Sequence, residues 1–180
     1  PDDLVIDVEF SGISTGTERL LWSGRMPAFP GMGYPLVPGY ESIGRVIDAG
    51  AGAKARIGER VFVPGSNCYA DVRGLFGGAA RRLIAPSVRV ANIAEGDGED
   101  SVLLALAATA YHALSAKHAA APELIVGHGV LGRLLARVAI ACGHPAPMVW
   151  ERNADRRTGA SGYDVIDPAQ DERRAYRSIY

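Results

Sequence analysis

Gly127-His128-Gly129-Val130-Leu131-Gly132 is a GxGxxG hexapeptide that lies between the apolar run Leu124–Val126 and the amphipathic run Val130–Cys142. A strand, a glycine-rich turn and a helix in this order typically bind the pyrophosphate of a dinucleotide. The first glycine permits the tight turn, the second lets the phosphates approach the backbone, and the third lets helix and strand pack closely. An ordinary glycine-rich turn of an α/β domain is the alternative, but this context favours cofactor binding by residues 127–132.

The residues after the loop continue the same pattern. Strands are expected at Met148–Trp150 and Asp164–Ile166, with a short polar helix between them. This alternation predicts an α/β fold, specifically the first half of a doubly wound parallel sheet over residues 122–180. One face of the helix should pack on the sheet, and its apolar members recur at helical spacing: Leu131, Leu134, Leu135, Val138 and Cys142.

Glu151 ends the second of these strands, about 20 residues past the loop, where an acidic side chain accepts hydrogen bonds from ribose hydroxyls. This position favours NAD over NADP. The neighbouring Arg152 leaves NADP open, because an arginine there also accommodates a 2′-phosphate. An ordinary solvated strand end is the alternative for Glu151.

The first hundred residues are rich in glycine, proline and β-branched residues and predict an irregular β-domain. Ile43–Ile47 should fold back antiparallel against Val61–Val63. Residues 101–121 are rich in alanine and leucine and predict a long helix or a helix pair that connects the two domains. The expected strands are Leu4–Phe10, Ser42–Ala49, Arg60–Val63, Arg82–Ala85 and Val88–Ile93.

Composition restricts the remaining classes. The chain has 20 acidic and 19 basic residues, so nothing indicates nucleic-acid binding. No apolar run reaches the roughly 20 residues of a membrane span, and no signal peptide is seen, so a cytoplasmic protein is expected. Cys68 and Cys142 are too few for a disulfide framework or a cysteine-rich zinc site. Both ends look cut, which indicates a fragment.

Three motifs resemble the medium-chain dehydrogenase/reductase family. Gly12–Glu18 is similar to its G-I-C-G-T-D segment with one residue added, Pro38–Glu41 to its P-G-H-E, and Ala107–Leu114 to the helix that leads into its cofactor domain. The resemblance implies a GroES-like substrate domain over residues 1–100, a connecting helix region over 101–121 and a partial NAD-binding Rossmann domain over 122–180.

The positions that hold catalytic zinc in this family read Thr15, Tyr40 and about Ala105 here, and only Glu41 remains as a ligand. One carboxylate cannot make the three-ligand site of a catalytic zinc. The four-cysteine structural zinc lobe is also missing, since Ser66–Gly78 contains only Cys68. The resemblance therefore implies dehydrogenase architecture without metal.

The resemblance also implies site residues. Thr17 matches the hydroxyl that binds the reacting alcohol, and Thr109 matches a threonine near the nicotinamide. We expect Thr17 and Tyr40 to hydrogen-bond the substrate hydroxyl, and Glu41 to receive or relay its proton. Thr17 could instead cap the helix-like Glu18–Ser23, and Glu41 could instead pair with a buried arginine.

Four aromatic residues fall in the segment that borders the substrate cleft in this family: Trp22, Phe29, Tyr34 and Tyr40. They would suit a flat macrocycle, or they could form a local hydrophobic plug.

The amino-acid sequences of Ser11–Gly24 and Pro35–Glu41 resemble those of a branch of the family whose enzymes belong to bacteriochlorophyll biosynthesis, and hence to photosynthesis. This resemblance implies NAD-dependent, zinc-independent oxidation of the 3-(1-hydroxyethyl) group of a bacteriochlorophyllide to acetyl, by a protein that could be a homo-oligomer at full length. Two alternatives stay open: a zinc-free quinone or enone reductase, and a nucleotide- or tetrapyrrole-binding protein without turnover.

Overall fold

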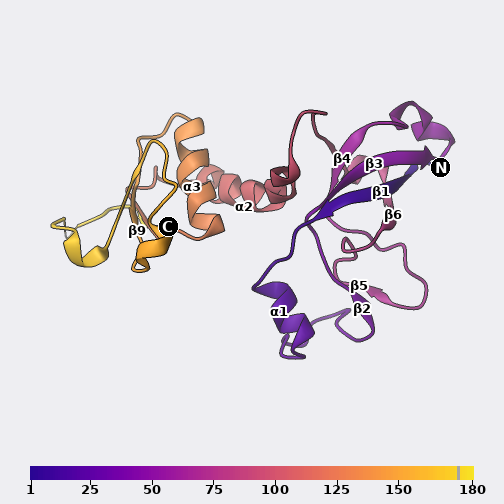
Figure 1. Cartoon of the computed structure of the whole chain (residues 1–180), viewed down its shortest axis with the longest axis horizontal. Helices are drawn as coiled ribbons and strands as arrows, with labels where there is room; N and C mark the ends of the chain where they lie inside the picture. Colours follow the sequence, from indigo (N-terminus) through magenta and orange to yellow (C-terminus); the bar gives the residue numbers. More distant parts are fainter. Residues whose placement is uncertain (174) are drawn as a thin grey trace. The chain divides into compact units, whose positions relative to one another are not determined.

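The computed structural model describes residues 1–173 and 175–180 (Figure 1). The chain divides into two compact units, Pro1–Ala105 and Leu106–Tyr180. This division falls inside the segment 101–121 that the sequence suggests as a connection. Among the described residues, no helix is long and apolar enough to cross a bilayer.

The first unit contains a five-stranded antiparallel sheet in the order β6-β1-β3-β4-β7. Alternating side chains of β1, such as Leu4 and Ile6, enter the core, where they meet Val61 and Leu83 from neighbouring strands. Ile43 pairs with Phe62, so the predicted antiparallel pairing is confirmed. The strands are β1 (Asp3–Ser11), β3 (Ser42–Ala49), β4 (Arg60–Val63), β6 (Arg82–Pro86) and β7 (Ala91–Asn92).

The last strand of this unit is shorter than predicted, because Val88–Ile93 does not form one continuous strand. Ser87–Arg89 is a 3-10 turn (η2), and only Ala91–Asn92 pairs with β4. Polar contacts hold the turn: the carbonyl oxygen of Ser87 accepts from Arg56 Nη1 at 2.6 Å. Val88 is exposed, so an extended strand would bury no apolar surface there.

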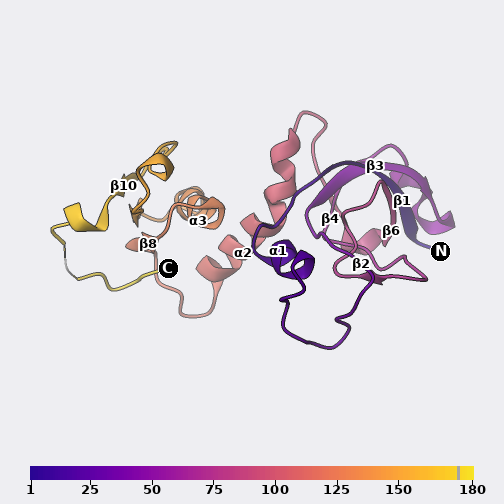
Figure 2. The same cartoon turned by 60° about the horizontal axis from the view of Figure 1, so that its bottom comes forward.

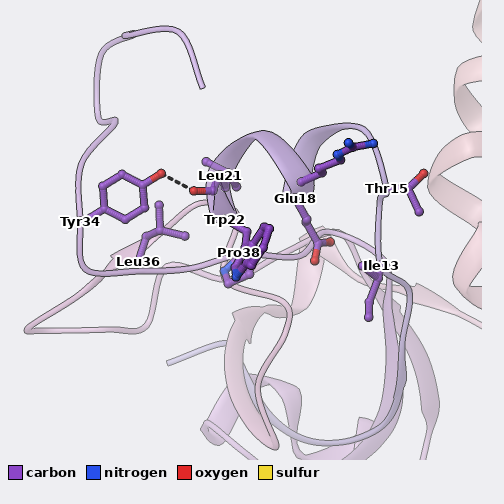
Figure 3. A pocket seen from close by; sticks show the side chains of 9 residues that line it. Ile13, Thr15, Glu18, Leu21, Trp22, Tyr34, Leu36 and Pro38 are labelled. Atoms are coloured by element: carbon purple, nitrogen blue, oxygen red, sulfur yellow. Dashed lines mark hydrogen bonds between the residues drawn. The ribbon is translucent and has the colours of Figure 1, made fainter. Parts of the chain in front are cut away.

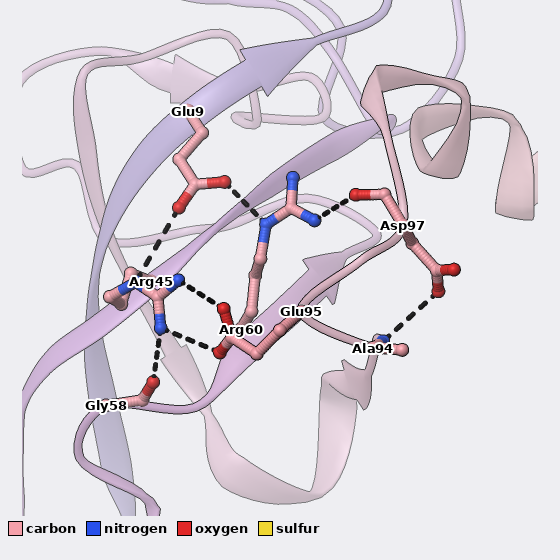
Figure 4. A network of polar contacts seen from close by, with 7 residues as sticks. All are labelled: Glu9, Arg45, Gly58, Arg60, Ala94, Glu95 and Asp97. Carbon is pink, nitrogen blue, oxygen red and sulfur yellow. Dashed lines mark hydrogen bonds and ion pairs between the residues drawn. The ribbon is translucent and has the colours of Figure 1, made fainter.

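A polar network ties three strands of this sheet to the segment that follows β7 (Figure 4). The buried guanidinium of Arg60 donates from Nε to Glu9 Oε2 at 2.6 Å and from Nη1 to the carbonyl oxygen of Asp97. Arg45 binds both carboxylate oxygens of Glu95, at 2.9 and 2.8 Å. The network therefore holds residues 94–97 against β1, β3 and β4.

The other elements of the first unit include α1 (Thr17–Trp22) and a two-stranded parallel sheet. Figure 1 shows α1 together with β2 and β5, beside the larger sheet. The small sheet pairs β2 (Leu36–Val37) with β5 (Arg73–Gly74). Two 3-10 segments complete the unit, η1 (Ala51–Arg56) and η3 (Glu99–Leu103).

The predicted connecting helix is two helical pieces. The 3-10 segment η3 leads into α2 (Leu104–Ser115), and residues 116–121 are not helical. The chain turns instead, because Ala119 donates to the carbonyl oxygen of Ala116 at 2.8 Å and His118 has a positive φ of 74°.

The second unit contains a parallel sheet in the order β10-β9-β8, as predicted for the start of a doubly wound fold. Its strands are β8 (Leu124–Val126), β9 (Met148–Trp150) and β10 (Asp164–Ile166). The helix α3 (Val130–Ala141) packs beside β8, and Figure 2 views it nearly along its axis.

The buried face of α3 combines part of the predicted apolar stripe with small residues. Leu135 is buried as expected, and Leu134 and Val138 pack partly buried against the core, but Leu131 and Cys142 are exposed. Gly132, Ala136 and Ala139 are fully covered, because short side chains let the helix approach the sheet closely. The leucines at the margin of this face remain in contact with solvent.

The predicted polar helix between β9 and β10 is only a 3-10 turn, η4 (Ala154–Arg156). Asn153 caps it, with Oδ1 accepting from the backbone N–H of Asp155 at 3.0 Å. Gly159 and Gly162 follow with positive φ values of 76° and 80°, which end regular helix. The last 3-10 turn of the unit is η5 (Pro168–Gln170).

The free edge of β8 is covered by the residues that follow β10. Ile179 bridges Leu124 in parallel, and the backbone N–H of Val126 donates to the carbonyl oxygen of Tyr180 at 2.9 Å. Residues 178–180 therefore occupy the place of the fourth strand in the order 3-2-1-4.

Candidate functional site

The glycine loop between β8 and α3 has the backbone geometry that a pyrophosphate requires. Gly127 has a φ of +103°, which only glycine adopts without strain. A Cβ at Gly132 would lie 2.0 Å from the carbonyl oxygen of Gly127, so this glycine lets the helix meet the loop. A Cβ at Gly129 would meet nothing within 4 Å, which leaves space for a ligand beside the backbone. The three glycines thus fit a bound dinucleotide.

The first turn of α3 adds an electrostatic contribution. Gly129 is its N-cap and offers no side chain to the free backbone N–H groups, and the first turn carries no acidic residue. Val130 and Leu131 are both exposed. The positive end of the helix dipole is therefore available to an anion.

Glu151 lies at the carboxyl end of β9 and returns its carboxylate to the loop. Oε2 accepts from the backbone N–H of His128 at 2.9 Å, and Oε1 accepts from that of Asn153 at 2.8 Å. The Asn153 bond and then the His128 bond lower the pKa of Glu151. The side chain is thus a fixed anion at the position suited to ribose, while Arg152 beside it is exposed.

The side chain of His128 does not line the loop's open face. It is only 1% exposed, and its two ring nitrogens lie 2.6 Å from the carbonyl oxygen of Arg156 and 2.7 Å from Tyr163 Oη. Its backbone is engaged as well, because the N–H donates to Glu151 and the carbonyl oxygen accepts from Arg133 Nε at 3.2 Å.

Thr17 and Tyr40 line one cavity of about 700 Å³ in the first unit. Thr17 is the first residue of α1, and the N-cap position belongs to Gly16, so the capping alternative for Thr17 is wrong. The ring of Tyr40 packs edge-on against Phe76, with ring centroids 5.7 Å apart. Apolar side chains make most of the remaining wall: Leu20, Leu21, Met26, Phe29, Pro64 and Leu75.

A second cavity, of about 840 Å³, also includes residues of α1 (Figure 3). We call it the Trp22 cavity and the first one the Thr17 cavity. Trp22, which is 90% exposed, and Tyr34 line the second cavity, and Tyr34 donates to the carbonyl oxygen of Leu21. Phe29 and Tyr40 line the first cavity instead. The four aromatic residues are therefore divided between two open apolar cavities.

Glu41 is 4% exposed, and its Oε1 has no hydrogen-bond partner among the described residues. Its carboxylate lies against Gly12, where a Cβ would approach Oε2 to 2.5 Å. Burial, and then the charge of Glu18, raises the pKa of Glu41. Within residues 1–173 and 175–180, no arginine forms an ion pair with Glu41, so the alternative pairing with a buried arginine is not seen there.

The structure adds residues that the sequence did not indicate. The negative charge of Glu18 adds to burial in raising the pKa of Glu41, and Glu18 Oε1 accepts from the backbone N–H of Ser14 at 3.1 Å. Leu75 and Phe76 reach the Thr17 cavity from far along the chain. The sequence signal for these two residues is that they form an apolar pair between Gly74 and Gly77 in an otherwise glycine-rich segment.

The positions of the family's catalytic metal ligands carry no metal-binding cluster here. Thr15 lines the Trp22 cavity, whereas Tyr40 lines the Thr17 cavity. No three His, Cys, Asp or Glu side chains of the described residues are grouped to hold an ion. Thr109 lies on an exposed part of α2 in the second unit.

The sequence pattern of the alcohol dehydrogenase GroES-like domain matches residues 1–95, which is more than half of the chain. The chain belongs to this family. The resemblance that the motifs predicted is confirmed.

Two curated relatives match over the whole chain, and both are named 2-desacetyl-2-hydroxyethyl bacteriochlorophyllide A dehydrogenase. The protein of Rhodobacter capsulatus is 58% identical over 181 residues, and that of Cereibacter sphaeroides is 57% identical over 185 residues. In each case this chain spans 58% of the relative's length.

Solved structures agree on the fold. 2R,3R-butanediol dehydrogenase of Bacillus subtilis has a TM-score of 0.75 at 21% identity, over 96% of this chain and 58% of that one. A dehydrogenase of Sinorhizobium meliloti bound to NADP has a TM-score of 0.71 at 26% identity, over 96% and 56%. The predicted fold class, a GroES-like domain followed by part of a Rossmann-like parallel sheet, is confirmed.

Proposed function

We propose that this chain belongs to an NAD-dependent enzyme that oxidises the 3-(1-hydroxyethyl) group of a bacteriochlorophyllide to acetyl. One observation carries the proposal: the 58% and 57% identity to two relatives of that name extends over the whole chain. Because the chain spans 58% of their length, the activity is proposed for the whole protein.

The loop Gly127–Gly132, the first turn of α3 and Glu151 would hold the cofactor. The open space at Gly129 and the free N–H groups of α3 suit its pyrophosphate, and the fixed carboxylate of Glu151 suits its ribose hydroxyls. The anionic Glu151 favours NAD, because it would repel the 2′-phosphate of NADP. Bound NAD supplies the acceptor for the hydride that leaves the carbinol carbon.

The Thr17 cavity suits the reacting end of the substrate. Thr17 and Tyr40 are the polar side chains that would hydrogen-bond the hydroxyl, inside a wall that is otherwise apolar. The exposed faces of Trp22 and Tyr34 provide flat apolar surface nearby on α1 and the following loop, which suits a macrocycle.

Oxidation also releases the hydroxyl proton, and Glu41 is its proposed acceptor, directly or through its neighbour Tyr40. A buried carboxylate such as that of Glu41, whose Oε1 has no hydrogen-bond partner among the described residues, favours binding a proton because burial penalises its charged form. The raised pKa of Glu41 brings it closer to the pH at which a general base works best.

We propose that the reaction proceeds without catalytic zinc, since Thr15 and Tyr40 stand at two of the ligand positions. Positive charge that develops at the carbinol carbon can spread into the conjugated macrocycle. This delocalisation lessens the need to form a full alkoxide. A metal would stabilise that alkoxide by roughly several kcal/mol.

The test is to incubate the full-length enzyme with NAD and hydroxyethyl bacteriochlorophyllide, while NADH formation is followed by absorbance and the acetyl product by mass. We expect equal amounts of NADH and acetyl product. Binding of both ligands without turnover, or reduction of quinones and enones in place of alcohol oxidation, would overturn the proposal. Assays with NADP and with added zinc or chelator test the cofactor and the metal.

A further inference from the structure

The buried imidazole of His128 has no part in the mechanism above, yet both of its ring nitrogens are bonded. Nδ1 lies 2.6 Å from the carbonyl oxygen of Arg156, and Nε2 lies 2.7 Å from Tyr163 Oη. The middle position of a GxG turn tolerates many residues, so a fully buried histidine there needs a reason of its own.

The partners of the ring fix its tautomer. A carbonyl oxygen can only accept, so Nδ1 carries the proton and donates to Arg156, and Nε2 accepts from the hydroxyl of Tyr163. Tyr163 is itself buried in the core of the second unit, with its ring edge-on to the imidazole at a centroid distance of 5.6 Å. The imidazole is thus held from both ends.

These bonds join the glycine loop to the connection between β9 and β10. Arg133 reinforces the junction, because its Nε donates to the carbonyl oxygen of His128 at 3.2 Å and its Nη2 donates to that of Arg156 at 3.1 Å. Both carboxylate oxygens of Glu151 accept from the joined segments, through the backbone N–H groups of His128 and Asn153. The position of Glu151 therefore depends on the junction.

We propose that His128 is a positioning residue for the adenosine half of the cofactor. Its side chain locks residues 153–157 against the glycine loop, so that Glu151 is preset to receive the ribose hydroxyls before the cofactor arrives. The inference rests on the proposed binding of NAD at this loop and adds how the ribose site is held.

Loss of the imidazole leaves the carbonyl oxygen of Arg156 with only its longer bond from Arg133, and it leaves the buried hydroxyl of Tyr163 without its histidine partner. The segment 153–157 then becomes more mobile, and the cofactor must order it on binding, which lowers affinity. The loss falls on ligands that carry the adenosine ribose. It does not fall on the chemical step once the site is saturated.

Three variants of the intact enzyme test this. His128→Ala removes both bonds, Tyr163→Phe removes one and keeps the ring packing, and His128→Asn places an amide N–H near the position of Nδ1. His118→Asn is the matched control, because His118 is exposed and asparagine tolerates its positive φ. Dissociation constants for NAD, NADP and ADP-ribose are measured by calorimetry, together with kcat, KM and amide hydrogen exchange.

We expect His128→Ala to weaken NAD and ADP-ribose in parallel, by about tenfold, equivalent to about 1.4 kcal/mol. KM for NAD rises while kcat is kept, the preference for NAD over NADP narrows, and exchange speeds up at Asn153–Arg157 but not in β8. Tyr163→Phe shifts affinity in the same direction by less, and His128→Asn recovers part of it.

Unchanged affinity for NAD and ADP-ribose in folded His128→Ala and Tyr163→Phe overturns the inference while the proposed function stands. If His128→Ala does not fold, Tyr163→Phe decides by the same readouts. If the unaltered enzyme binds neither ligand, the proposed cofactor site and this inference fail together.

Discussion

The carboxyl group of Glu41 is buried, has no hydrogen-bond partner for Oε1 among the described residues, and feels the negative charge of Glu18. Its pKa is raised in the folded state, so the folded protein holds a proton more tightly than the unfolded chain does. Stability therefore falls as the pH rises from 4.5, the ordinary pKa of a glutamate carboxyl group, through the raised pKa of Glu41 in the folded protein.

Glu41→Gln removes this penalty and also removes the proposed proton acceptor. We expect a higher Tm than the unaltered protein at neutral pH, a smaller slope of stability against pH, and a kcat lower by about 10²–10⁴. Thermal melts over a pH series and steady-state kinetics measure these. Tyr40→Phe is the companion variant, and unchanged kcat in both would remove the proton relay.

The charge of Glu151 is expected to determine the preference for NAD over NADP. Glu151→Gln keeps an acceptor for a backbone N–H but loses the charge that repels a 2′-phosphate, so the ratio of kcat/KM for NAD to that for NADP should narrow. Arg152→Gln is the matched variant and should widen the ratio if Arg152 attracts that phosphate. Equal kcat/KM for the two cofactors in the unaltered enzyme would take Glu151 out of this role.

At the scale of elements, two glycines of the turn between β8 and α3 have different roles. Gly132 is needed for packing, whereas Gly129 is proposed for cofactor binding. Gly132→Ala places a methyl group 2.0 Å from a backbone oxygen, whereas Gly129→Ala places one in open space. We expect Gly132→Ala to destabilise the protein by about 1–3 kcal/mol. Gly129→Ala should cost at most about 1 kcal/mol of stability but weaken NAD by about tenfold or more.

Chemical denaturation and calorimetry on the two variants measure this difference. Native NAD affinity in a folded Gly129→Ala protein would show that the pyrophosphate does not approach this glycine.

The elements that the sequence predicted well are those whose pattern is local. The glycine loop, the strand pairing of Ile43 with Phe62 and the parallel order of β8 and β9 follow from short apolar runs and turn residues. The errors have physical causes outside such windows. The face of α3 is chosen by close packing on the sheet, which favours Ala136 and Ala139 over larger side chains.

The candidate site shows the same limit. The loop and Glu151 are found by spacing, because the chemistry of pyrophosphate and ribose fixes that spacing. Other features depend on residues that folding brings together. They are the absence of a partner for Glu41 Oε1 among the described residues, the effect of Glu18 on Glu41, and the bond between the buried His128 and Tyr163. No pattern within a short stretch of sequence carries that information.

At the scale of the whole molecule, the chain holds two separate cores. Leu4, Ile6 and Val61 belong to the core of the first unit, and Ile125 and Val149 belong to that of the second.

The proposed site residues are also divided between the two units. The second unit contains the proposed cofactor residues Gly129, Glu151 and Thr109, and the first unit contains Thr17, Tyr40 and Glu41. Ligands should therefore stabilise the two units unequally.

This inequality is measurable by amide hydrogen exchange with and without NAD. A ligand that binds only the folded state, at about 100 times its Kd, adds about 2.7 kcal/mol, or about 100-fold protection of amides that exchange by unfolding of the unit that binds it. We expect this gain in β8 and β9 and a smaller one in β1 and β3, since the loop proposed to contact NAD continues directly from β8. Gly129→Ala at the same NAD concentration is the control and should lose most of the gain. A gain of equal size in that variant, or no gain in β8 and β9 of the unaltered protein, would place NAD binding away from the glycine loop.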